Sequence, residues 1–157
     1  MSLDGEALGR VSSHALAQKG VAYVPQGREI FPLMTVRENL ETGYACLPKN
    51  EHRVPEEIYE LFPVLLEMKA RRGGILSGGQ QQQLAIARAL ASGPKVLLLD
   101  EPTEGIQPSI IREMARTLRK IRDQKGLSIV VSEQVLSFAL DVADRVLVIE
   151  NGRFVHD

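Results

Sequence analysis

The chain has 157 residues and a net charge of −1, with 44% hydrophobic, 25% charged and 4% aromatic residues. This length suffices for one domain with a hydrophobic core, and the near-neutral charge and scarce aromatic rings argue against a nucleic-acid-binding surface. A single cysteine excludes an intrachain disulfide, and no apolar run reaches the roughly 18 residues of a membrane-spanning helix.

The first half of the chain begins with a short predicted strand and continues with predicted helices. Residues 21–24 are rich in β-forming residues, and a proline ends the run. Thr35 is expected to cap a short helix, because Glu38 follows it at the spacing of a capping box. Pro55 opens a second helical stretch and Pro63 interrupts it, so we expect a kink or two short helices. The apolar stripe of this stretch comprises Ile58, Leu61, Phe62, Leu65 and Leu66.

The second half alternates predicted helices with predicted strands. A helix is expected after Ser77. The continuous apolar run 96–99 predicts a strand that is buried on both faces, and 128–132 is expected to form a second buried strand. Asn151-Gly152 is typical of a β-hairpin turn. Further helices are expected at 110–122 and 138–143, and hairpin strands at 145–150 and 153–156. This alternation predicts an α/β fold with a largely parallel sheet, whereas residues 35–92 contain no predicted strand and form an inserted helical subdomain.

Two adjacent carboxylates, Asp100 and Glu101, end the apolar run that starts at Val96. A strand in this position delivers them at the carboxyl edge of the sheet, where α/β proteins bind ligands. Successive strand residues point in opposite directions, so one acid can hold a metal while the other orients or deprotonates water. The structural alternative is a strand that simply ends in an acidic turn, and the two residues alone do not decide between these interpretations.

A second candidate site is the helix start at Ser77-Gly78-Gly79. A helix N-terminus offers free N–H groups and a partial positive charge, and glycines allow a phosphate to approach the backbone closely. The alternative is a capping serine that follows a flexible turn. One predicted helix and one turn separate Ser77 from Asp100, and this arrangement favours phosphate chemistry.

Three segments together resemble the motifs of ATP-binding cassette (ABC) ATPases. Leu76-Ser77-Gly78-Gly79-Gln80 resembles their signature motif, and Val96 to Glu101 resembles their Walker B strand. Gln26, which follows a strand and precedes a helical insertion, resembles their Q-loop glutamine. The three motifs occur in the order of the family and cover nearly the whole chain.

The resemblance implies a P-loop NTPase core with a largely parallel sheet and an inserted α-helical subdomain. Residues 1–157 would then form a single partial ABC ATPase domain. Its RecA-like core would comprise residues 1–34 and 93–157, and its helical subdomain, with the signature motif, residues 35–92.

The same resemblance implies roles for individual residues. In the family, two such domains dimerise head to tail and enclose ATP between them. Asp100 would support Mg²⁺, Gln26 would link the metal to the helical subdomain, and Glu101 would polarise the attacking water. The nucleotide bound by the partner domain would be contacted by Ser77, Gly78, Gly79 and Gln80.

Finer features resemble the ATP-binding subunits of importers for branched-chain amino acids and urea. These features are the segments 24–32, 100–108 and 132–134. Arg72-Gly73-Gly74, which precedes the signature motif, and the glutamine run 80–83 are closest to the urea type. This resemblance implies a peripheral subunit at the cytoplasmic face of the cell membrane, which contacts permease subunits through the region around Gln26 and Arg28. Two alternatives stay open: a soluble ABC ATPase of DNA repair or translation, and an inactive fragment.

Two positions depart from the family pattern. The switch position, usually histidine, is Gln134, and its amide can hydrogen-bond a γ-phosphate but cannot take up charge. Alternatively, Gln134 only caps the end of a strand. Gln107 stands where the family often has a loop aspartate, which puts the usual communication between the two nucleotide sites in question. The histidines of the chain lie elsewhere, at positions typical of surface residues: His14, His52 and His156.

The largest departure is the absence of a P-loop. No G-x-x-x-x-G-K-[ST] occurs in the sequence, and this is the motif that cradles the triphosphate. The chain is therefore interpreted as a subunit that starts late. We expect residues 1–157 alone to lack ATPase activity and to leave the strand at 128–132 with an unpaired edge.

Overall fold

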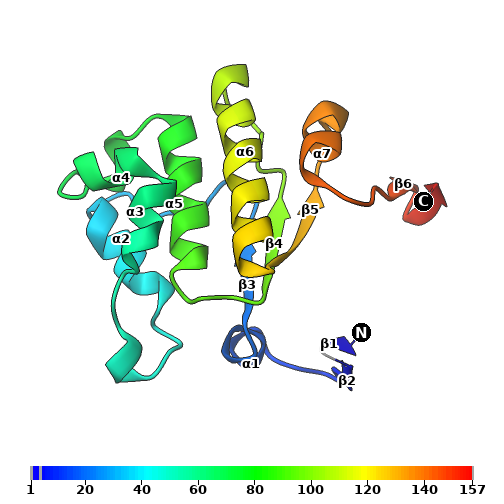
Figure 1. Cartoon of the computed structure of the whole chain (residues 1–157), viewed down its shortest axis with the longest axis horizontal. Helices are drawn as coiled ribbons and strands as arrows, with labels where there is room; N and C mark the ends of the chain where they lie inside the picture. Colours follow the sequence, from blue (N-terminus) through cyan, green and yellow to red (C-terminus); the bar gives the residue numbers. More distant parts are fainter. Residues whose placement is uncertain (1, 4, 157) are drawn as a thin grey trace.

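A parallel three-stranded sheet lies at the centre of the molecule. The computed structural model describes residues 2–3 and 5–156. The strands β3 (Val21–Val24), β4 (Val96–Asp100) and β5 (Ser128–Ser132) are hydrogen-bonded in the order β3-β4-β5. Helices α5 (Gly78–Leu90) and α6 (Pro108–Lys125) pack against one face of the sheet (Figure 1). The predicted strands and their parallel pairing are thus confirmed.

The two faces of this sheet differ in burial. Val24, Leu97 and Leu99 point toward the helices and are 2% exposed or less. On the opposite face, Tyr23 and Val130 are 56% and 57% exposed. The expectation that 96–99 is buried on both faces, and that 128–132 forms a second buried strand, is therefore wrong. Among the described residues, helices cover only one face, so each strand alternates between covered and open positions.

Residues 35–92 fold as helices that pack against α5, as the sequence predicts. Ile58, Phe62 and Leu65 are nearly fully buried, whereas Leu66, at the margin of the stripe, is 49% exposed. Pro63 separates two short helices, one of the two outcomes predicted for this stretch, and two turns of 3-10 helix complete the subdomain. The elements are α2 (Val36–Gly43), η1 (Lys49–Glu51), α3 (Glu56–Leu61), α4 (Pro63–Glu67) and η2 (Gly73–Ile75). The Thr35–Glu38 capping box predicted at the start of α2 is confirmed.

The remaining elements lie around the sheet. The sequence places α6 at 110–122, but the helix extends two residues earlier and three later, and it ends at Gly126 in the left-handed conformation. The Asn151-Gly152 hairpin is confirmed and stands apart from the sheet (Figure 1). These elements are β1 (Ser2–Leu3), β2 (Glu6–Ala7), α1 (Ser13–Gln18), α7 (Leu136–Val142), β6 (Val148–Glu150) and β7 (Arg153–His156). No helix in the described part of the chain has the length and hydropathy needed to cross a membrane.

The edge of β5 gives the first testable prediction. Within residues 2–3 and 5–156, β5 pairs only with β4, and Val130 is exposed beside its free edge. An exposed hydrophobic edge strand promotes self-association, and a lysine on such a strand opposes it. We expect Val130→Lys to shift the chain toward the monomer in light scattering, with a stability change within about 0.5 kcal/mol. Leu66→Lys, on α4, is the matched control and should leave association unchanged. A monomeric unsubstituted chain with a cooperative, high-temperature melt would contradict this prediction.

Candidate functional site

The two adjacent carboxylates lie where the parallel strands end. Asp100 is the last residue of β4, and Glu101 follows with a φ of 43°, an uncommon backbone conformation for a glutamate. The Glu101 N–H donates to the Ser132 carbonyl at 2.9 Å, which extends the pairing of β4 with β5 by one step. The strained backbone therefore turns the Glu101 side chain out of the strand alternation while the strand ends stay joined.

Two glutamine amides hold the Glu101 carboxylate from two different loops. Gln26, just after β3, donates from Nε2 to Glu101 Oε2 at 3.2 Å. Gln134, just after β5, donates from Nε2 to Glu101 Oε1 at 2.6 Å. The same Gln26 nitrogen also donates to Glu104 Oε2 at 3.2 Å. Three residues that the sequence singled out, from three strand ends, are thus brought together at one edge of the sheet.

Asp100 contacts Tyr23, a residue that no sequence motif singled out. The Tyr23 hydroxyl donates to Asp100 Oδ2 at 3.3 Å, from the open face of the sheet. Loss of solvation, and then the negative charge and hydrogen bond of Asp100, raise the pKa of Tyr23. The alternation within 21–24 could have placed Tyr23 on the face opposite Val24, but not beside Asp100. Among the described residues, no group of three or more His, Cys, Asp or Glu side chains could hold a metal ion.

The start of α5 is a complete capping box. The Ser77 hydroxyl accepts from the Gln80 N–H at 3.3 Å, and the Gln80 side-chain oxygen accepts from the Ser77 N–H at 3.0 Å. The alternative interpretation of Ser77, a serine that caps the helix, is thus confirmed. Ser77 is exposed, so its hydroxyl proton remains able to donate to a ligand.

The two glycines at the start of α5 face different neighbours within the chain. A Cβ at Gly79 would lie 2.9 Å from Ile110 Cγ2, in the first turn of α6. A Cβ at Gly78 would lie 3.5 Å from the Gly105 carbonyl and 3.6 Å from the Arg28 guanidinium, which are ordinary contact distances. Gly79 is therefore required by the close approach of two helices, before any ligand is considered.

A matched pair of substitutions tests this difference. Gly79→Ala should lower the free energy of unfolding by about 1–3 kcal/mol, because the new methyl group overpacks against Ile110. Gly78→Ala should leave stability unchanged or raise it by at most about 1 kcal/mol, since alanine favours the helix and meets no close neighbour. Urea denaturation of the chain measures both. Equal midpoints for the two variants would show that the packing of α5 on α6 relaxes freely.

Two arginines fix the loop that follows Gln26. The Arg28 guanidinium donates to Gln82 Oε1 at 3.2 Å and to the Glu104 carbonyl at 2.7 Å. Arg88 of α5 donates to the Glu29 carbonyl at 2.9 Å and to the Arg28 carbonyl at 3.4 Å, and burial lowers its pKa. Arg28 and Glu29 both have positive φ, so these bonds hold a strained loop along α5. No pattern in the sequence predicts these contacts.

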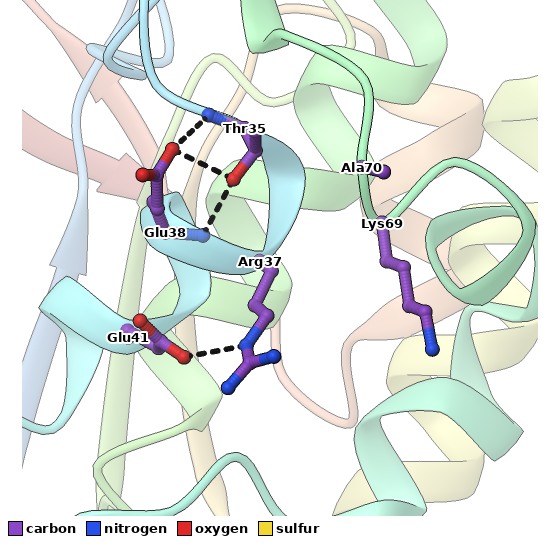
Figure 2. A pocket seen from close by; sticks show the side chains of 6 residues that line it. All are labelled: Thr35, Arg37, Glu38, Glu41, Lys69 and Ala70. Carbon is purple, nitrogen blue, oxygen red and sulfur yellow. Dashed lines mark hydrogen bonds and ion pairs between the residues drawn. The ribbon is translucent and has the colours of Figure 1, made fainter.

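A groove of about 420 Å³ lies between α2 and the segment after α4, and Figure 2 shows the residues that line it. Its charged groups are largely engaged with each other: Arg37 bonds Glu41 at 2.7 Å, and hydrogen bonds from the Thr35 N–H and hydroxyl lower the pKa of Glu38. The N–H groups of the first turn of α2 donate to the carbonyls of residues 69 and 71. The groove contains none of the predicted site residues, and the first helical N–H groups beside it are engaged within the chain, so nothing in it identifies a phosphate site.

Comparisons with known proteins agree with the motifs. A family model described as ABC transporter matches residues 1–104. The chain is 44% identical over 156 residues to the high-affinity branched-chain amino acid transport ATP-binding protein BraG of Pseudomonas aeruginosa, covering 98% of this chain and 66% of the relative. It is 34% identical over 153 residues to the probable branched-chain amino acid transport ATP-binding protein LivF of Archaeoglobus fulgidus, covering 96% and 64%.

A solved structure supports the fold in the same way. The ATP-binding cassette MJ0796, in a dimeric post-hydrolysis state bound to ADP and Pi, matches with a TM-score of 0.80 at 25% identity, covering 98% of this chain and 70% of that chain. The predicted ABC ATPase fold is thus confirmed. The chain spans about two thirds of the length of the curated relatives it matches. Because the family model covers more than half of the chain, and Gln26, Ser77 and Glu101 all lie in the matched range, the chain belongs to the ABC transporter family.

Proposed function

We propose that the chain is the signature-bearing part of an ATP-binding subunit that hydrolyses ATP to energise the import of a small polar solute. The observation that carries this proposal is the position of the Glu101 carboxylate between the amides of Gln26 and Gln134. A carboxylate held on both oxygens by neighbouring loops is oriented before a substrate arrives, and such preorganisation is what the activation of a water molecule requires.

The residues at the strand ends fit a magnesium ion with a nucleotide. Asp100 offers carboxylate oxygens and Gln26 an amide oxygen, the hard ligands that Mg²⁺ prefers, and this ion commonly takes one or two protein ligands besides phosphates and water. Bound Mg²⁺-ATP supplies the γ-phosphoryl group and the charge neutralisation that its transfer needs. We assign Asp100 and Gln26 to holding the metal. The Gln26 amide nitrogen donates to Glu101, so its amide oxygen is the atom that would face the metal.

Glu101 and the signature motif would act on opposite sides of the phosphates. Glu101 accepts a proton from the attacking water, and Gln134 donates a hydrogen bond to the γ-phosphate in place of the usual histidine. Ser77, Gly78, Gly79 and Gln80 contact the nucleotide that a second ABC subunit presents head to tail. The start of α5 supports this assignment, because Ser77 is exposed and the Gly78 backbone lies beside the loops that follow β3 and β4.

The domain division 1–34 and 93–157 against 35–92 belongs to the same proposal. It is supported by the helix-only content of α2 to α5 and by the parallel sheet formed from the flanking segments. Since no P-loop motif occurs in residues 1–157, ATP hydrolysis requires a P-loop supplied outside these residues.

The solute class is proposed from the names of the relatives, because the site itself contains no solute-binding residues that the proposal uses. BraG and LivF are named for branched-chain amino acid transport, and we propose such an amino acid as the solute class. Urea stays a prediction that rests on Arg72-Gly73-Gly74 and the glutamine run. We place the subunit at the cytoplasmic face of the cell membrane, bound to permease subunits through the region around Gln26 and Arg28. Leu33, 80% exposed, and Ile75, 68% exposed, offer apolar contact area near that region.

Transport by a reconstituted complex tests the proposal. The gene product that contains this chain is assembled with its permease in vesicles, and uptake of labelled leucine and urea is measured with and without ATP. ATP-dependent leucine uptake supports the proposal, whereas urea uptake alone supports the urea prediction. ATP hydrolysis without uptake of either solute would overturn the importer assignment and leave the ATPase assignment in place.

A further inference from the structure

A carboxylate outside the motif set joins two loops of the candidate site. Glu133 follows β5 directly, and Thr103 lies three residues after the end of β4. Glu133 Oε1 accepts from the Thr103 hydroxyl at 2.9 Å, and Oε2 accepts from the Thr103 N–H at 3.3 Å. Thr103 is only 5% exposed and Glu133 is half-buried, so this pair of bonds is partly shielded from water.

The same carboxylate organises the loop that carries Gln134. Glu133 Oε1 also accepts from the N–H groups of Gln134 at 3.0 Å and Val135 at 3.1 Å. Four donors from two loops therefore converge on one side chain. A carboxylate suits this position because it only accepts hydrogen bonds, and charge-assisted bonds of this kind are about twice as strong as neutral ones.

We propose that Glu133 is a positioning residue, whose carboxylate ties the loop after β4 to the loop after β5 and thereby sets the distance between Glu101 and Gln134. The Glu101 backbone has a φ of 43°, and such strain persists only where neighbouring bonds hold it. The Ser132 carbonyl holds it on the strand side, and the Glu133–Thr103 pair holds the turn that follows. The 2.6 Å bond from Gln134 to Glu101 is the result of this arrangement.

A purely local role for Glu133 would require fewer hydrogen bonds than the structure shows. If Glu133 only capped the turn before α7, its bonds to the Gln134 and Val135 N–H groups would suffice, and Thr103 would be irrelevant. The two bonds to Thr103 span 30 residues of sequence and connect different strand ends. Thr103→Val removes the hydroxyl bond while leaving the cap intact, so it separates the two roles.

The inference rests on the proposed role of Glu101, but its test needs no ATP and reads the geometry of the chain itself. Amide hydrogen exchange by nuclear magnetic resonance is compared in the unsubstituted chain, Glu133→Ala and the control Glu113→Ala on the exposed side of α6. We expect the Thr103, Gln134 and Val135 amides to exchange at least about tenfold faster in Glu133→Ala, the usual effect of losing a charge-assisted bond. The control should leave them unchanged.

A second measurement reads the Glu101–Gln134 contact directly. In the unsubstituted chain, Glu101→Gln should shift the side-chain amide resonances of Gln134, because its acceptor changes from a carboxylate to an amide. With Glu133→Ala or Thr103→Val present, the shift should fall by more than half. If Glu133→Ala does not fold, Thr103→Val decides the question. An undiminished shift in Thr103→Val would overturn the positioning role, and failure of the transport test alone would not.

Discussion

Replacing Glu101 with glutamine should lower the kcat for ATP hydrolysis by about 100- to 10,000-fold, the usual contribution of a general base. The subunit must carry a P-loop, and KM for ATP should change little, because the role proposed for Glu101 is toward the water and not toward the nucleotide. The structure gives a second reason for the loss. Glu101 accepts from Gln26 and Gln134, and a glutamine would present its own amide donor to one of them.

Steady-state phosphate release and nucleotide trapping check this prediction together. The Glu101→Gln dimer should retain bound ATP, because closure no longer leads to hydrolysis. Glu113→Gln, an equally conservative change on the exposed side of α6, is the matched control and should keep the unsubstituted rate. Hydrolysis by Glu101→Gln at that rate would show that another group activates the water.

Residues 1–157 alone should not bind ATP measurably below about millimolar concentration. Millimolar binding requires roughly 4 kcal/mol of net free energy. A helix N-terminus that faces an anion contributes about 0.3–1 kcal/mol, and up to about 2 in partly buried geometry. The Ser77 hydroxyl adds about 1 kcal/mol. The sum stays below the requirement even before the loss of translational and rotational freedom is counted.

The structure lowers the expected affinity further. The Ser77 and Gln80 N–H groups already donate within the capping box, so neither adds a free donor for a phosphate. Asp100 and Glu101 repel a triphosphate unless Mg²⁺ is bound, and the sequence contains no P-loop to hold the phosphates. Calorimetric titration of Mg-ATP into the chain measures this. Saturable micromolar binding would mean that residues outside the family's P-loop pattern can hold the nucleotide.

Local sequence patterns correctly predicted those elements whose boundaries depend on residues only a few positions apart. The spacing of Thr35 and Glu38 gave the start of α2, Pro63 gave the break between α3 and α4, and Asn151-Gly152 gave the hairpin. Each of these depends on backbone chemistry within a few residues. The burial of β5 was mispredicted because it depends on which layers lie on either side of the sheet, and an apolar run carries no information about that.

The site shows the same division between local and distant causes. The position of Glu101 at a strand end follows from the sequence, because a buried apolar run leads directly into it. The bonds from Tyr23 to Asp100 and from Arg28 to Glu104 span 77 and 76 residues, so only the folded chain reveals them. The roles of the motif residues in catalysis and nucleotide binding stay predictions.

The amides beside Glu101 also bear on how the site responds to acidity. Histidine is the side chain that normally changes its charge between pH 5 and 8, whereas a glutamine amide keeps its protons throughout that range. The three histidines of the chain are exposed, and the side chains that donate to Glu101 are the amides of Gln26 and Gln134, so these donors stay the same when the surroundings acidify. Control of uptake by acidity would therefore have to act on another part of the transporter.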